Sequence, residues 1–233
     1  MPLPYYVSPE QMMQDKAEYA RKGIAKGKSI IALEYRDGVL ILAENPSAAL
    51  NKISEIYDRI AFAGAGKYSE FERLRKEGIR YADLKGYAYG REDVTAKSLA
   101  NAYSQAIGNI FSMEIKPLEV EILVLEVGEG TAGNELYRIT FDGSIADEKD
   151  YATIGGQAEE LKLFLRDKYR DSLSLEEALR LAGRGLEAAA SQKVKAVNME
   201  VAVLERERVG RKFRRIPLAE LRELMEKEGE GAG

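Results

Sequence analysis

The sequence of 233 residues contains neither cysteine nor histidine. These absences exclude thiol nucleophiles, disulfides and zinc sites with the usual ligands. The absence of histidine also excludes every catalytic triad built on an imidazole base. Chemistry would have to use serine, threonine, lysine, tyrosine or carboxylates, and no spaced acidic loop typical of Mg²⁺ or Ca²⁺ sites occurs. We therefore expect no metal and no cofactor.

Long apolar runs and an excess of positive charge are also missing. No run of about 18 apolar residues occurs, so no transmembrane helix is expected. The first residues, MPLPYYVSPEQ, lack the basic end and apolar core of a secretory signal, which predicts a cytoplasmic protein. The formal net charge of -4 argues against a nucleic-acid partner. With 45% hydrophobic residues, the chain has ample material for a core.

The segment 28–67 organises the rest of the chain, because it contains two β-hairpins in succession. Turns are predicted at Arg36-Asp37-Gly38 and at Asp58-Arg59. The first hairpin is nearly continuous in apolar residues, so both of its faces are expected to be covered. The expected strands are Ser29–Tyr35, Val39–Glu44, Lys52–Tyr57 and Ile60–Ala65.

The remaining helices and strands follow without a regular βαβ alternation. Ser8 is expected to cap an N-terminal helix, and Gly78 to weaken the middle of a long one. The order favours two antiparallel sheets packed face to face, with a helix pair on each outer side. This is an α+β fold, a four-layer αββα sandwich with an extra N-terminal helix. The expected helices are 8–25, 69–87, 95–113, 157–169, 175–191 and 217–227, and the later strands are 120–127, 135–141, 151–154, 198–205 and 213–216.

No linker or internal repeat divides the chain. We therefore expect a single domain over residues 8–227, with its N-terminal helix at 8–26. An extended segment 1–7 precedes it, since Pro2 and Pro4 remove backbone donors. The tail 228–233 is rich in glycine and glutamate, which predicts disorder.

Short motifs are spread in order along almost the whole chain. Glu18-Tyr19-Ala20-Arg21 leads into Lys26-Gly27-Lys28-Ser29, and Gly64-Ala65-Gly66 closes the fourth strand. With Lys52-Ile53 and Phe141-Asp142-Gly143-Ser144, this arrangement resembles the proteasome family, specifically its α-type subunits. Three further segments resemble the actinobacterial type: Ser8-Pro9-Glu10-Gln11, Ala43-Glu44-Asn45-Pro46-Ser47 and Tyr137-Arg138-Ile139-Thr140.

The resemblance implies a structural and gating role without catalysis. Family α subunits form seven-membered rings at both ends of a barrel, and the inner β subunits cut peptides with an N-terminal threonine. The implied partners are further copies of this chain, β subunits in an α7β7β7α7 barrel, an AAA+ ATPase ring and unfolded protein substrates. By resemblance to actinobacterial systems, substrates would arrive tagged with the small ubiquitin-like protein Pup.

The nucleophile position of a β subunit, matched strand for strand, falls on Lys28. An N-terminal nucleophile needs a Thr, Ser or Cys with a free α-amine. Ser29 would meet this condition only after cleavage behind Lys28. Glu44 and Lys52 lie near the positions of the acidic and lysine helpers in β subunits, which predicts a catalytic scaffold without its nucleophile. The alternatives are an N-terminal-nucleophile hydrolase matured by cleavage before Ser29, or an unrelated scaffold protein with no seven-fold assembly.

Lys52 is the foremost candidate binding residue. In the family, a lysine at this position lies in a pocket between neighbouring α subunits and pairs with the C-terminal carboxylate of an activator. The alternative is a lysine at a strand start that lies in solvent. Gly66 and Lys67 are expected to contribute backbone N–H groups to the same pocket. They do not form a nucleotide-binding loop, because position 61 is alanine and Tyr68 follows Lys67.

The resemblance places the gate at the N-terminus, in Met1–Val7. The following helix carries Met12, Met13 and Tyr19, which pack either on their own domain or on neighbouring copies around a pore. The Tyr-Asp-Arg tripeptide common in archaeal and eukaryotic relatives is missing, and Tyr5-Tyr6-Val7 stands in its region. The expected gate residues are Pro4, Tyr5, Tyr6, Val7, Ser8, Pro9 and Tyr19.

A basic run near the C-terminus raises nucleic-acid binding as an alternative. Glu205 and Glu207 are interleaved with it, and the chain as a whole is acidic. Both features favour a solvated hairpin. The basic residues, with Phe213 among them, are Arg206, Arg208, Arg211, Lys212, Arg214 and Arg215.

Overall fold

The computed structural model describes residues 8–47, 49–190 and 193–226. The expected gate segment 1–7 and tail 228–233 lie outside this part, so the division of the chain into segments stays a prediction. One sheet contains β1 (Ile30–Tyr35), β2 (Gly38–Glu44), β8 (Tyr151–Ile154), β9 (Met199–Glu205) and β10 (Phe213–Arg215). The other contains β3 (Ile53–Tyr57), β4 (Ile60–Gly66), β5 (Val120–Glu126), β6 (Glu135–Ile139) and β7 (Ile145–Glu148).

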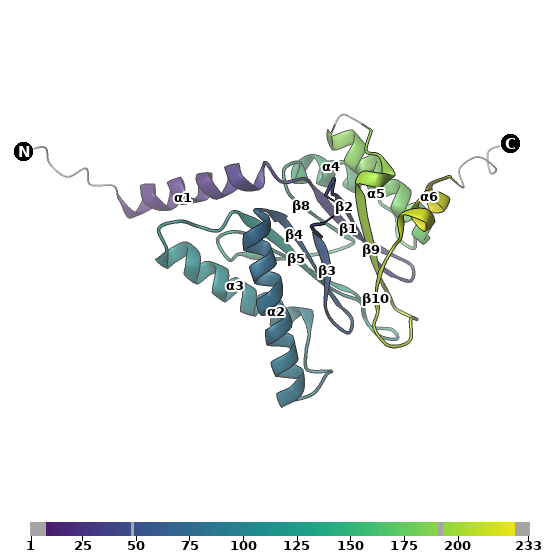
Figure 1. Cartoon of the computed structure of the whole chain (residues 1–233), viewed down its shortest axis with the longest axis horizontal. Coiled ribbons are helices and arrows are strands. Elements are labelled where there is room, and N and C mark those ends of the chain that lie inside the picture. Colours follow the sequence, from purple (N-terminus) through teal and green to yellow (C-terminus); the bar gives the residue numbers. More distant parts are fainter. Residues whose placement is uncertain (1–7, 48, 191–192, 227–233) are drawn as a thin grey trace, which may run out of the picture.

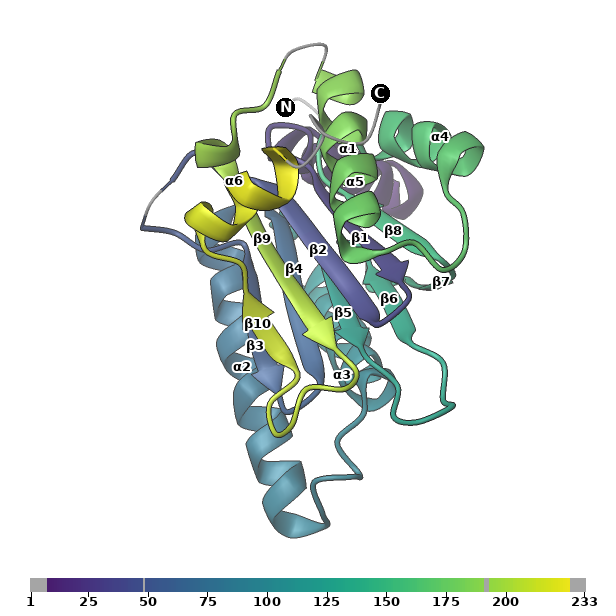
Figure 2. The same cartoon turned by 90° about the vertical axis from the view of Figure 1, so that its right-hand side faces the viewer.

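Helices cover the outer faces of both sheets. The described helices are α1 (Pro9–Ile24), α2 (Tyr68–Ala88), α3 (Ala96–Met113), α4 (Ala158–Lys168), α5 (Leu175–Ala190) and α6 (Leu218–Glu226), with a 3₁₀ turn at Ala196–Asn198. Helices α2 and α3 lie on the sheet of β3–β7, whereas α4, α5 and α6 lie on the other sheet (Figures 1 and 2). The predicted four-layer αββα sandwich is confirmed. None of the described helices is long and apolar enough to cross a membrane.

The two hairpins of segment 28–67 form as predicted but belong to different sheets. The strand orders are β10-β9-β2-β1-β8 and β3-β4-β5-β6-β7, so the first hairpin is central and the second lies at an edge. All seven residues of β2 are buried, whereas β3 is only partly buried. A strand buried on both faces needs partners at both edges, and β8 and β9 supply them from far along the chain.

The main core lies between the two sheets. Its side chains come from alternate positions of the facing strands, as the two-residue period of a strand requires. Two further apolar layers lie between each sheet and its helices, one under α4–α6 and one under α2 and α3. The inter-sheet core includes Ile30, Ala32, Val39, Ile41, Ile53, Ala61, Ala63, Leu123, Leu125, Leu136, Ala202 and Leu204.

The sequence predicted α2 but not strand β7, and it gave no reason for the glycine within α2. Strand β7 is a partly exposed edge strand of four residues, so it lacks the apolar run that marks buried strands. Helix α2 runs unbroken for 21 residues through Gly78. An added Cβ at Gly78 would lie 1.9 Å from Tyr103 Oη, which donates a hydrogen bond of 2.9 Å to Leu74 O. The glycine therefore makes room for α3 and does not interrupt the helix.

Helix α1 runs away from the sandwich, on the far side from α6 (Figure 1). Its C-terminal half packs on the body, where Ala20 and Ile24 are buried against Phe141. Buried Lys16 donates a hydrogen bond of 3.1 Å to Phe111 O in the last turn of α3. A cation at this end of a helix interacts favourably with the helix dipole. The helix is thus anchored from Lys16 onward, and its residues 9–15 are exposed in the described part of the chain.

Candidate functional sites at the Lys52 corner and helix α1

The predicted docking residue Lys52 lies where the end of α1, the start of β1, the end of β2 and the start of β3 meet. We call this region the Lys52 corner and define it by Lys28, Glu44, Lys52 and Glu200. Lys52 Nζ donates a hydrogen bond of 2.9 Å to Lys28 O, and Lys28 Nζ lies 2.8 Å from Glu44 Oε1. The structure therefore brings together the three residues that the sequence matched to a catalytic scaffold.

Lys52 is a half-buried cation without an internal counter-ion. Burial lowers the pKa of Lys52 to about 8, against the opposing effect of Glu200 and Glu44, while Lys28 lowers it further. In the part of the chain that the structure describes, no carboxylate forms an ion pair with Lys52 Nζ, whose hydrogen-bond partner is the neutral Lys28 carbonyl. A lysine in this state gains by pairing with an incoming carboxylate.

Glu200 is the residue of the corner that sequence reasoning missed. Its side chain is buried and accepts hydrogen bonds from Asn45 Nδ2 (2.7 Å), Lys52 N (2.8 Å) and Ile53 N (3.1 Å). It also pairs with the guanidinium of Arg215. The available signal was an acidic residue near the start of strand β9, directly before four apolar residues, with arginines in the next strand.

Gly66 and Lys67 lie beside the corner but offer less than predicted. Gly66 has φ +101°, and an added Cβ on Gly27 would lie 2.8 Å from Gly66 N, so the two backbones are in close contact. The Lys67 N–H already donates to Glu119 O at 2.9 Å, so this group is not free to hold a carboxylate. The Lys67 ammonium lies 3.4 Å from Glu70 Oε1. A role of either residue in a docking pocket stays a prediction.

The structure disfavours Ser29 as a nucleophile. Ser29 is 1% exposed, and its Oγ accepts a hydrogen bond from Gln157 N at 3.2 Å. Residues Gly27 and Lys28 connect α1 to β1 without a break, and Gly27 O accepts from Gly156 N at 3.0 Å. Cleavage before Ser29 would therefore have to act on a segment that is packed and hydrogen-bonded on both sides.

Three of the predicted gate residues are described, and they start and anchor α1. Ser8 Oγ accepts from Gln11 N at 3.1 Å and caps the helix, and Pro9 is its first residue. Tyr19 Oη donates to Glu119 Oε1 at 3.3 Å. The other gate residues, Pro4, Tyr5, Tyr6 and Val7, lie outside the described residues.

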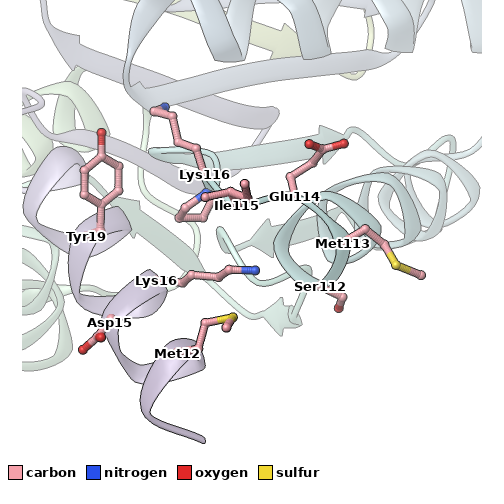
Figure 3. A pocket seen from close by; sticks show the side chains of 10 residues that line it. Met12, Asp15, Lys16, Tyr19, Ser112, Met113, Glu114, Ile115 and Lys116 are labelled. Carbon is pink, nitrogen blue, oxygen red and sulfur yellow. The ribbon is translucent and has the colours of Figure 1, made fainter. Parts of the chain in front are cut away.

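A cavity of about 650 Å³ opens between the first half of α1 and the segment after α3. Figure 3 shows Met12, Lys16 and Tyr19 on one side and Met113 and Ile115 on the other. Met113 and Ile115 are 83% and 94% exposed, so the described residues of the chain leave this apolar surface uncovered. The first half of α1 thus borders an exposed apolar cavity that the sandwich of the described residues does not fill.

Most side chains of the basic run near the C-terminus form ion pairs or hydrogen bonds within the chain. Arg214 pairs with Glu205 and Glu220 at 2.8 Å each, and Arg211 pairs with Glu55. Arg206 donates to the carbonyls of Gly128 and Ala132 at 2.7 Å. Cations held in this way are poorly placed to bind phosphates, which supports the structural interpretation of the hairpin.

An αββα sandwich of two five-stranded antiparallel sheets places the chain in the proteasome-like class of N-terminal-nucleophile folds. A family model described as "Proteasome subunit" matches residues 24–204. The chain therefore belongs to the proteasome subunit family. The match includes the Lys52 corner and excludes nearly all of α1.

Relatives that align over most of their length include α-type proteasome subunits. The chain is 52% identical to the proteasome subunit alpha of Thermomonospora curvata, over 97% of this chain and 98% of that protein. It is 54% identical to that of Xylanimonas cellulosilytica, over 93% of each chain, and 54% identical to that of Thermobifida fusca, over 93% and 88%. This similarity confirms the predicted resemblance to actinobacterial α-type subunits and extends over α1.

Proposed function

We propose that this chain is a non-catalytic α subunit of a 20S proteasome core, which forms a heptameric outer ring, gates substrate entry and docks an AAA+ ATPase. The observation that carries the proposal is the position of Lys28. The place of a β-subunit nucleophile is taken by a lysine inside an unbroken chain, so no free α-amine is available to act as base. What remains of the catalytic scaffold is a charged corner suited to binding.

Ring assembly is supported by the exposed side of α1. Tyr19 is 47% exposed, Met12 is 48% exposed, and both line the cavity with Ile115. Exposed apolar surface of this kind marks interaction sites. A neighbouring copy of the chain is the occupant that a ring of α subunits requires. In this arrangement, β subunits lie on the next ring and residues 1–7 narrow the entrance.

Activator docking is supported by the state of Lys52. A half-buried ammonium with only a carbonyl partner is complementary to a terminal carboxylate. Gly66 and Lys67 complete the proposed pocket from the adjacent strand end. The proposed activator is an AAA+ ATPase ring that delivers unfolded protein, and Pup-tagged substrates follow by analogy with actinobacterial systems.

The first test is native mass spectrometry of the chain, alone and mixed with its β partner. Full-length subunits in multiples of seven support the ring and exclude maturation before Ser29. A monomer that never joins a β ring, or a subunit that begins at Ser29, contradicts the proposal. The docking role is tested with Lys52→Ala, which is expected to abolish ATPase-dependent degradation while cleavage of small peptides continues.

A further inference from the structure

Lys52 directly precedes the edge strand β3, so strand pairing holds its backbone on one side only. Strand β3 pairs only with β4, so the N–H groups of Lys52 and Ile53 have no strand partner on the other side. Both N–H groups donate to the carboxylate of Glu200, at 2.8 Å and 3.1 Å. Glu200 lies on β9 in the opposite sheet, so one buried side chain ties the two sheets together at this point.

The same carboxylate also orders the loop that leads into Lys52. Asn45 Nδ2 donates to Glu200 Oε2 at 2.7 Å and to Leu50 O at 2.7 Å. Arg215 pairs with Glu200 and donates to Ile53 O at 2.7 Å. Glu200 therefore bonds Lys52 and Ile53 directly, and through Asn45 and Arg215 it connects to the backbone carbonyls of Leu50 and Ile53.

We propose that Glu200 is a positioning residue for carboxylate capture by Lys52: it fixes the backbone of Lys52 and keeps a negative charge beside the ammonium. The proposal rests on the docking role proposed above. The charged group that acts on the ammonium from the segment between α1 and β1 is Lys28, that from β2 is Glu44, and that from β9 is Glu200, which itself pairs with Arg215 of β10. Glu44 is paired with Lys28, whereas Glu200 acts on Lys52 through both its charge and its backbone bonds.

A matched control exists elsewhere in the chain. Glu126 is also a buried carboxylate on a strand, and it accepts from a backbone N–H, that of Ala96, at 2.6 Å. It also pairs with an arginine, Arg59, at 2.6 Å. Glu200→Gln and Glu126→Gln therefore remove the same kind of charge and leave the same kind of donors unsatisfied. Only the first lies beside Lys52.

The experiment uses assembled particles containing the chain, its β partner and the ATPase. The measured quantity is the ratio of ATPase-stimulated to unstimulated cleavage, together with the pH profile of acetylation of Lys52 by acetic anhydride, read by peptide mass spectrometry. Glu200→Gln is expected to lower the pKa of Lys52. If the pKa falls by one unit from its value of about 8, the protonated fraction of Lys52 at pH 7.5, and with it the ratio, falls about threefold. Glu126→Gln is expected to change neither quantity.

Asn45→Ala provides a second variant in case Glu200→Gln fails to assemble. It is expected to lower the ratio of stimulated to unstimulated cleavage, by a smaller factor than Glu200→Gln does. In a Lys52→Ala background, Glu200→Gln should have no additional effect. Equal losses in Glu200→Gln and Glu126→Gln, or an unchanged Lys52 acetylation profile, overturn the proposal. If Lys52→Ala itself leaves the ratio unchanged, the docking function fails, while the acetylation profile still decides whether Glu200 acts on Lys52.

Discussion

Lysine residues at strand ends usually extend into water, and Lys52 differs because it is half-buried in a corner that contains two carboxylates already engaged elsewhere. Glu44 is paired with Lys28, and Glu200 with Arg215 and backbone N–H groups. The ammonium therefore loses hydration without gaining an ion pair of its own. A group in this condition is disfavoured in its charged form, and the proposed incoming carboxylate would offset this.

Docking should depend on pH in the range where Lys52 titrates. Its pKa is lowered to about 8 by burial, so the charged form that binds a carboxylate is lost as pH rises through 8. Activator affinity should fall by up to about tenfold per pH unit above that value. Lys52→Arg, which stays charged throughout, should show no such decline. Measurements of ATPase binding between about pH 7 and 9 test this, and equal slopes in both proteins would contradict it.

Lys52→Met should separate function from stability. Methionine keeps the apolar stem and removes a charge that burial disfavours, so the melting temperature is expected to stay the same or rise. ATPase-dependent degradation should be lost in the same variant. A melting temperature lower by more than a few degrees would show instead that the hydrogen bond from Lys52 to Lys28 O is structural.

At the scale of single elements, helix α2 shows how packing overrides propensity. Glycine within a helix normally costs about 1 kcal/mol relative to alanine. At Gly78, Tyr103 Oη occupies the space that a Cβ would need, and it donates a hydrogen bond to Leu74 O from there. The sequence contains the glycine but not the reason for it, because the tyrosine comes from the next helix.

Gly78→Ala is therefore expected to destabilise the chain by about 2 kcal/mol, although propensity alone predicts a gain. Tyr103→Phe removes the colliding oxygen, so the double variant should be less destabilised than the sum of the two single variants. Chemical denaturation of all four proteins measures this coupling. A more stable Gly78→Ala protein would contradict the packing argument.

At the scale of the whole molecule, the sandwich buries its own apolar faces, whereas the first half of α1 stays exposed. Three apolar layers bury the strands and the inner sides of helices α2–α6. The first half of α1 faces the cavity that exposed Met113 and Ile115 line, so the described residues leave an apolar surface uncovered there. This division matches the family comparison, in which the general family model begins at residue 24 and the α-type relatives include α1.

Ile115→Glu is expected to prevent ring assembly without unfolding the subunit. Ile115 is 94% exposed, so its replacement removes little from the core of the single chain. A buried charge at a contact between copies would be costly. Val209, which is 96% exposed on the hairpin between β9 and β10, provides the control Val209→Glu. Native mass spectrometry should show heptamers for the control alone, and heptamers in both variants would exclude this cavity from the contact.

Local signals in the sequence determined most elements of this protein. Apolar runs located the buried strands β1, β2 and β5, and Ser8 located the start of α1 through a hydrogen bond within three residues. The lack of cysteine and histidine, and lysine at position 28, already argued against catalysis. These predictions depend on chemistry within a short stretch of chain, so they need no knowledge of distant neighbours.

Only the tertiary structure decided which distant residues act together. The division of the two hairpins between sheets depends on β8 and β9, which arrive more than 100 residues later. Glu200 holds Lys52 across 148 residues of sequence, and Lys16 reaches α3 across 95. Such contacts depend on how the two sheets and the N-terminal helix pack, because burial of apolar faces fixes the register and only then are the polar groups brought together.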